Sequence, residues 1–176
     1  MSSRPSSRQS GFSLLEVLIA LLILSLGLIG LAGLMVVSIR TNHTAFLRSQ
    51  ATFLADDIAE RMRANIAGVW KSDYNSDAYP VTISSPPTCA SGATCNYDDL
   101  AKKDQAEWSN MLTQLLPAAE ASVDCEIQSG VNLANIKVGL RPPYNGLCTV
   151  RISWSEQGVA AGAAESKQTF SWVFQP

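Results

Sequence analysis

The chain contains a long apolar run near its N-terminus, from Val17 to Ile39, with no charged residue among its twenty-three positions. At 1.5 Å of rise per residue a helix of this length reaches ~35 Å, and a bilayer's hydrocarbon core is ~30 Å thick. Glu16, directly in front of the run, is the one charge between Gly11 and Ile39. The run therefore predicts a single membrane-spanning helix.

The flanks of this run predict its orientation. Residues 1–11 carry Arg4 and Arg8 and no acidic residue, so the N-terminal side is expected to stay cytoplasmic and the remainder to lie outside the cytoplasm. The net charge of the chain is −2, and without these two arginines it is 11 − 15 = −4. Because an acidic domain repels nucleic-acid phosphates, we expect no nucleic-acid partner.

The leader differs from an ordinary secretory signal, in which an apolar core of 7–15 residues precedes a small-residue cleavage site. Here the apolar run is longer, no A-x-A pattern follows it, and the small residue Gly11 stands in front of it. This order predicts that the hydrophobic segment is kept after processing.

Gly11, Phe12 and Glu16, inside an otherwise unbroken apolar helix, closely resemble the type IV pilin signal. The resemblance implies that a prepilin peptidase cuts between Gly11 and Phe12 and that Phe12 is then N-methylated. It also implies that the apolar helix serves both as membrane anchor and as filament core.

The position of Glu16 has a physical interpretation of its own. An ionisable side chain within a membrane segment costs ~2.5–3.5 kcal/mol on insertion scales and usually marks a function. A freed α-amino group on Phe12, of the same or of a neighbouring subunit, would compensate the carboxylate. The resemblance favours the neighbour, which makes Glu16 a subunit-docking element. The alternative is that Glu16 only reaches back to the cytoplasmic interface.

Beyond Arg40 the pattern becomes amphipathic, and Gly68 offers a helix stop. The apolar positions recur at helical spacing and should pack on a globular head: Leu47, Ala51, Leu54, Ile58, Met62 and Val69. Phe46 and Phe53 lie off this face and are available to neighbouring stems, unless they pack under loops of the head. The chain is thereby divided into a cleaved leader (1–11), a transmembrane half of the stem helix (12–39), an amphipathic half (40–68) and an extracytoplasmic head (69–176).

The four cysteines, Cys89, Cys95, Cys125 and Cys148, fit two disulfides in an oxidising compartment, with three possible connectivities. A zinc site made of four thiolates is the alternative, but paired C-x₂-C spacing is absent. Cys89 and Cys95 enclose only five residues, so a local bridge is easy. Cys125 and Cys148 fall on the inward-facing positions of two predicted strands, which favours their pairing.

The head is expected to combine a helix with a sheet. Residues 70–96 have the composition of a long surface connection, which is a candidate partner surface. A helix capped by Asn96 or Asp98 should end at Pro117. Period-two alternation predicts four antiparallel strands with one covered face, around 123–127, 136–140, 148–154 and 170–174.

The fold class is therefore α+β and resembles the type IV pilin fold: a long N-terminal helix packed on a four-stranded antiparallel sheet, with a second short helix. Tyr97-Asp-Asp-Leu, a tryptophan-containing helix and Leu115-Leu116-Pro117 resemble the PilV-like branch of minor pilins, the type IV pilus modification proteins.

Nothing in the sequence indicates catalysis. His43 is the only histidine, and with the cysteines assigned to bridges no base remains to activate a serine or threonine. We expect no enzymatic activity, no cofactor and no metal.

The sequence thus predicts a minor pilin that takes part in the initiation and assembly of type IV pili. The implied partners are the prepilin peptidase, other minor and major pilins through the stem, and the inner membrane. The head would be periplasmic, with possible incorporation in the pilus at the cell surface. Two alternatives remain: a minor pseudopilin of a type II secretion system, and a membrane-anchored or pilus-tip adhesin whose 70–96 segment contacts a surface.

Overall fold

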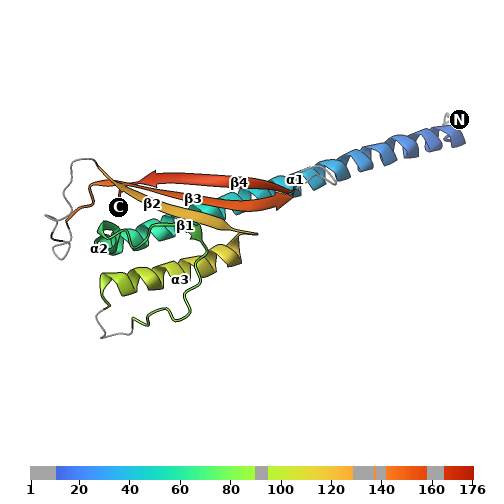
Figure 1. Ribbon diagram of the computed structural model, residues 1–176. Coiled ribbons are helices and arrows are strands. Elements are labelled where there is room, and N and C mark those ends of the chain that lie inside the picture. The colour runs from blue at the N-terminus through green and yellow to red at the C-terminus, as the bar shows by residue number, and fades with distance from the viewer. Residues whose placement is uncertain (1–10, 90–94, 129–136, 138–141, 158–164) are drawn as a thin grey trace, which may run out of the picture. The chain divides into compact units, whose positions relative to one another are not determined.

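The computed structural model describes residues 11–89, 95–128, 137, 142–157 and 165–176. The chain divides into two compact units, Met1–Asn42 and His43–Pro176. Helix α1, Leu14–Ala64, begins in the first unit and ends in the second (Figure 1). Its sequence contains no proline, so nothing removes a backbone donor from the helix along its length.

In the first unit, α1 is preceded by Ser13, whose carbonyl accepts hydrogen bonds from the N–H groups of Glu16 (3.0 Å) and Val17 (3.3 Å). Every residue from Gly11 to Ile39 is exposed. By length and composition, α1 is apolar enough to cross a membrane.

In the second unit, the last part of α1 buries the predicted apolar face, which is confirmed. Leu54, Ile58 and Met62 are fully buried, and Ala55 and Ala59 widen the face. Small residues beside large ones let neighbouring elements approach this helix closely, so it forms one wall of the hydrophobic core.

The predicted helix stop at Gly68 is wrong. Helix α1 ends at Ala64, and Asn65 then caps a short helix α2, Ile66–Trp70, which contains Gly68. The Asn65 side chain accepts a hydrogen bond from the Gly68 N–H at 3.4 Å. A Cβ on Gly68 would lie 2.7 Å from the Asn65 amide nitrogen, so glycine permits this close turn rather than ending the helix.

The sheet contains four antiparallel strands in the order β1-β2-β3-β4 among the described residues. Their bounds are Ser76–Tyr79 (β1), Glu120–Ile127 (β2), Gly146–Gln157 (β3) and Glu165–Phe174 (β4). The predicted inward positions are confirmed for three strands. Val123, Val150 and Ile152 are buried, whereas Glu126 and Arg151 face solvent.

One strand differs from the prediction. Residues 70–96, interpreted as a surface connection, contribute β1, because the Asn75 side chain bonds both the N–H and the carbonyl of Cys125 in β2 and aligns the chain beside it. The predicted strand at 136–140 falls outside the described residues except for Lys137, which lies in no strand.

The second helix of the predicted fold is α3, Tyr97–Leu115, and Asn96 is its N-cap, accepting a hydrogen bond from the Asp99 N–H at 2.7 Å. The helix packs beside the last part of α1, where the fully buried Trp108 donates from Nε1 to the Leu54 carbonyl at 2.8 Å. The predicted fold class is confirmed: a long helix, a four-stranded antiparallel sheet and a second helix.

Candidate functional site

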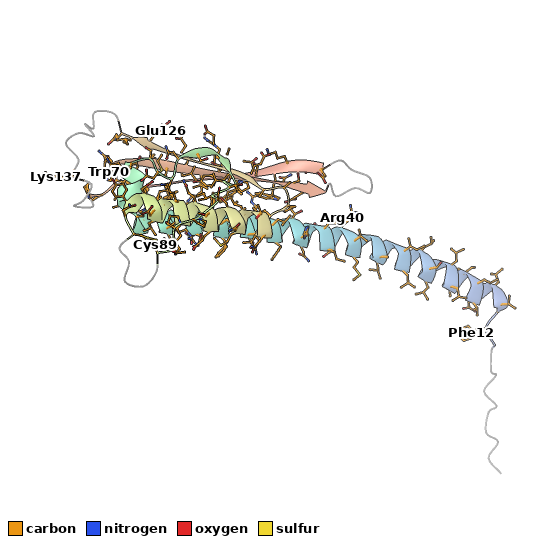
Figure 2. The ribbon with its side chains drawn as sticks, turned by 60° about the horizontal axis from the view of Figure 1, so that its bottom comes forward. Phe12, Arg40, Trp70, Cys89, Glu126 and Lys137 are labelled. Carbon is orange, nitrogen blue, oxygen red and sulfur yellow. A yellow bond between two sulfur atoms is a disulfide. The ribbon has the colours of Figure 1, made fainter. Side chains whose placement is uncertain are left out.

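The residues of the predicted leader junction lie at the start of α1. Gly11 and Phe12 precede the helix, and the Phe12 side chain is 84% exposed (Figure 2). Glu16 occupies the first turn, where a carboxylate favours the positive end of the helix dipole. A Cβ on Gly11 would meet no atom within 4 Å. The junction is thus accessible, and its cleavage, methylation and docking roles remain predictions.

The apolar part of α1 presents a continuous hydrophobic surface. From Leu14 to Ile39 each leucine, isoleucine, valine and methionine is exposed. Soluble monomers rarely expose apolar patches beyond a few hundred Å². Lipid or other helices must therefore cover this surface for the chain to be stable in a cell.

In the second unit, α1 exposes two aromatic side chains, Phe46 and Phe53. Both side chains are about half exposed, so they do not pack under described loops of the head. The expectation that they are available to a neighbouring chain is compatible with this exposure. His43, near them, is also exposed.

The head contains two disulfides. Cys125 and Cys148 are directly opposite one another on β2 and β3, with their Cα atoms 4.0 Å apart. Cys89 and Cys95 form the second bridge, with Cα atoms 5.6 Å apart. No cysteine is left free to act as a nucleophile or a metal ligand.

A buried polar cluster, which sequence reasoning missed, joins the end of α1 to α3. The Tyr74 hydroxyl donates to Asp104 Oδ2 at 2.7 Å, and Asn65 Nδ2 donates to the Tyr74 oxygen at 3.0 Å and to the Tyr97 carbonyl at 2.8 Å. Burial, together with the Asp104 carboxylate, raises the pKa of Tyr74 above its ordinary value. Tyr74 is therefore a neutral donor at physiological pH.

Arg61 of α1 supplies a positive charge beside the Asp104 carboxylate of this cluster. Its guanidinium pairs with Asp57 (2.7 Å), Glu107 (2.8 Å) and Asp104 (3.2 Å). Burial lowers the pKa of Arg61, but hydrogen bonds to Glu107 and Asp57 outweigh it and hold that pKa above its usual value. Burial raises the pKa of Asp104, while Tyr74 and Arg61 oppose this shift. Asp57 is thus part of an ion-pair network.

The substitution Asn65→Ala is expected to lower the free energy of unfolding by about 1–3 kcal/mol, because it removes the hydrogen bonds from Asn65 to the Tyr74 hydroxyl and the Tyr97 carbonyl, together with the N-cap of α2. Denaturant unfolding of the full chain in detergent micelles measures this change. Asn110→Ala is the control, since Asn110 is exposed on α3. Equal stability losses in the two variants would contradict a structural role for the cluster.

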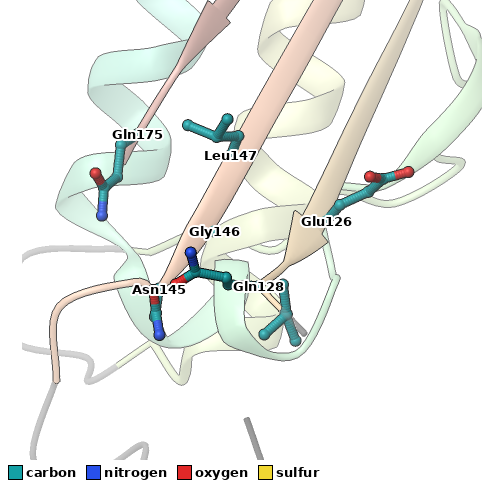
Figure 3. Close-up of a pocket in the computed structure, with 7 residues that line it drawn as sticks. Glu126, Gln128, Asn145, Gly146, Leu147 and Gln175 are labelled. Atoms are coloured by element: carbon teal, nitrogen blue, oxygen red, sulfur yellow. The ribbon is translucent and has the colours of Figure 1, made fainter. Parts of the chain in front are cut away.

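The described residues offer no constellation for metal chemistry, since no group of three or more histidine, cysteine, aspartate or glutamate side chains gathers there. An open pocket of about 610 Å³ lies at one end of the sheet (Figure 3). Its lining includes Glu126, Gln128, Asn145 and Gln175. Glu126 is the single ionisable group among its described lining residues, so these residues supply no acid–base pair.

Models of two known protein families match parts of this chain. A family model for the prokaryotic N-terminal methylation motif matches residues 6–32, and a model described as type IV pilin Tt1218 matches residues 33–106. Together the two matches support a resemblance to type IV pilins that carry a prepilin methylation motif. Comparisons with curated proteins and with solved structures gave no match.

The motif contains Gly11, Phe12 and Glu16, and the matched part of the pilin domain contains the rest of α1, α2, β1 and the first half of α3. A prepilin motif implies processing by a peptidase and association with other pilins. Together with the apolar helix behind it, the motif indicates a membrane-anchored, pilus-related structural subunit. Strands β2, β3 and β4 lie beyond both matched ranges.

Proposed function

We propose that this type IV pilin-like chain is a minor pilin of the PilV-like group, which takes part in the initiation and assembly of type IV pili. In this proposal residues 1–11 are a leader removed by the prepilin peptidase, and Phe12 becomes the N-methylated terminus. Residues 12–39 anchor the subunit in the inner membrane with the N-terminus cytoplasmic. Residues 40–68 connect the anchor to a periplasmic head of residues 69–176.

The observation that carries the proposal is the exposed apolar surface of α1 behind a prepilin motif. Each fully covered leucine or isoleucine contributes about 1.5–3 kcal/mol through removal from water. Such a surface is stable in a bilayer and equally among the apolar helices of a filament. A subunit of this kind can be stored in a membrane and then transferred to a fibre.

In this proposal Glu16 selects the position at which a subunit docks when it moves from the membrane to the filament. The carboxylate precedes twenty-three uncharged residues, so once the helix is surrounded by apolar neighbours it needs a positive partner. The α-amino group of a processed Phe12 supplies that charge on a neighbouring subunit. Pairing would then occur only at one axial position of the joining helix.

The substitution Glu16→Gln tests this role. The variant is expected to be cleaved and inserted like the wild type, yet to be incorporated into filaments at least about tenfold less, because it loses the charge that pairs with the neighbour. Quantitative immunoblotting of sheared filaments and of membranes measures the ratio. Glu126→Gln, an exposed carboxylate on β2, is the control. Normal incorporation of Glu16→Gln would show that the charge is not a docking element.

The methylation motif is equally compatible with a minor pseudopilin of a type II secretion system, and the exposed head with an adhesin. Deleting the gene and scoring piliation, twitching and secretion separates these functions. Lost piliation supports the minor pilin. Lost secretion with normal pili favours the pseudopilin, and normal assembly with lost adhesion favours the adhesin.

A further inference from the structure

Among the described residues, strand β4 forms one edge of the sheet, with β3 on its other side (Figure 1). Its pairing with β3 is continuous from Cys148↔Phe174 to Gln157↔Glu165, without a register shift. The segment from Gln168 to Phe174 carries neither charge nor proline. Proteins usually blunt an exposed edge with charges, prolines or bulges, because an open edge can pair with another chain. This edge has none of these devices over its last seven residues.

The direction in which the backbone N–H and C=O groups of β4 point follows from the pairing of β2 with β3. The backbone N–H and carbonyl of Cys125 bond to the Asn75 side chain, away from β3. Cys125 and Cys148, whose Cα atoms are 4.0 Å apart, are therefore a non-hydrogen-bonded pair. Since pairs alternate, the backbone of Cys148 bonds to Phe174 on β4.

By the same alternation, the backbone groups of Phe170, Trp172 and Phe174 point toward β3. Those of three intervening residues point out from the edge: Thr169, Ser171 and Val173. All three side chains are exposed. The edge therefore presents alternating donors and acceptors with the spacing that an incoming strand needs.

A groove runs beside this edge, between β4 and the head part of α1. It has a volume of about 360 Å³, and its lining is mostly apolar. The described lining residues are Thr52, Phe53, Asp56, Phe170 and Trp172. Phe53 is 55% exposed, so a large part of its ring is available for contact. The groove fits the side chain of a segment that pairs with the edge.

Asp56 gives the groove a charge preference. Its carboxylate is exposed, and no cation of the described residues forms an ion pair with it. A basic side chain on the occupant would complement this charge. A second copy paired through β4 would bring two Asp56 carboxylates to one symmetric interface, which disfavours self-association.

We propose that the β4 edge and the Phe53–Trp172 groove receive an extended segment of a different protein. The segment adds a fifth strand to the sheet, places an apolar side chain in the groove and directs a basic side chain toward Asp56. Main-chain pairing supplies the affinity, and the groove with Asp56 supplies the specificity. This interaction involves residues of the unit His43–Pro176 alone and does not depend on cleavage at Gly11 or on docking through Glu16.

Crosslinking in the native cell tests the proposal on the full chain. A photo-reactive phenylalanine analogue at Val173, whose side chain is exposed, leaves the backbone of the edge intact. Mass spectrometry of the adduct is expected to identify an extended segment of another protein, with alternating apolar residues and a basic residue. A synthetic peptide of that segment should then slow hydrogen exchange at the Thr169, Ser171 and Val173 amides.

Two variants distinguish binding at this interface from nonspecific binding. Ser171→Pro removes the outward N–H at a position that an edge strand tolerates, and Asp56→Lys reverses the groove charge. Each is expected to lower the crosslink yield about tenfold. Ser171→Ala and Asp77→Lys, the latter on β1, are the matched controls and should retain the yield. Retention of the Cys125–Cys148 disulfide reports folding.

Three results would overturn the proposal: no adduct at Val173, an adduct with a second copy of this chain, or an undiminished yield with Asp56→Lys. Because Asp56 is exposed, that variant is expected to fold even if Ser171→Pro does not. The incorporation of Glu16→Gln into filaments is unaffected by any of these outcomes, so the two proposals fail separately.

Discussion

The substitution Gly11→Val is expected to yield a chain that keeps residues 1–11, lacks N-methylation at Phe12 and is absent from filaments. In the proposed processing the scissile bond directly follows Gly11, where a branched side chain adds bulk beside the reacting carbonyl. A Cβ at this position meets no atom of the described chain within 4 Å, so the fold of the subunit is unchanged. Intact-mass measurement of the membrane form detects the retained leader.

Gly30→Ala is the matched control for Gly11→Val. It also adds a Cβ to an open position of α1, yet lies far along the chain from the junction, so processing should be normal. Wild-type protein should begin at methylated Phe12. Normal cleavage of Gly11→Val, or a mature wild-type terminus elsewhere, would contradict the proposed processing.

The substitution Trp108→Ala is expected to destabilise the head by about 3–5 kcal/mol, the range for removing a large buried aromatic side chain. Trp108 is fully buried, packs its ring edge against Tyr79 at 4.9 Å between centroids, and donates to the Leu54 carbonyl. Its loss leaves a cavity where α1, α3 and the region of β1 meet. Denaturant unfolding of the full chain in micelles measures the effect.

Two further variants divide this effect into its parts. Trp108→Phe keeps most of the buried ring but removes the hydrogen bond to the Leu54 carbonyl, so a smaller loss of about 0.5–1.5 kcal/mol is expected. Phe46→Ala removes an exposed aromatic ring and should change stability by no more than about 0.5 kcal/mol. A Trp108→Ala loss no larger than that of Phe46→Ala would show that α3 does not stabilise the head.

The strands show which parts of the fold can be predicted from the local sequence pattern. Alternation predicted β2, β3 and β4 and their inward faces because each strand buries one face against the helices, and burial repeats every second residue. β1 carries no such pattern, since Ser76–Tyr79 contains one large apolar residue. Its pairing depends on Asn75, which bonds to Cys125 across fifty positions of sequence.

The end of α1 and the polar cluster also could not be predicted from the local sequence. Gly68 looked like a stop because glycine often ends helices, but the helix ended earlier, where the Asn65 side chain found partners in Gly68, Tyr74 and Tyr97. Likewise Arg61 of α1 pairs with Asp104 and Glu107 because folding brings α3 beside it. Tyr97 lies 32 positions from Asn65, and Asp104 lies 43 positions from Arg61, so no periodicity within α1 indicates these contacts.

The sequence by itself determined the apolar stem, the position of Glu16 directly in front of it and the buried face of the last part of α1. Each of these depends on composition or on spacing within a single element. Only the tertiary structure decided that β1 joins the sheet, that Arg61 completes a partly buried network and that, among the described residues, β4 is an edge beside an apolar groove. Those features depend on which distant backbone and side-chain groups meet, and hydrogen bonds and ion pairs form only at the short distances that folding creates.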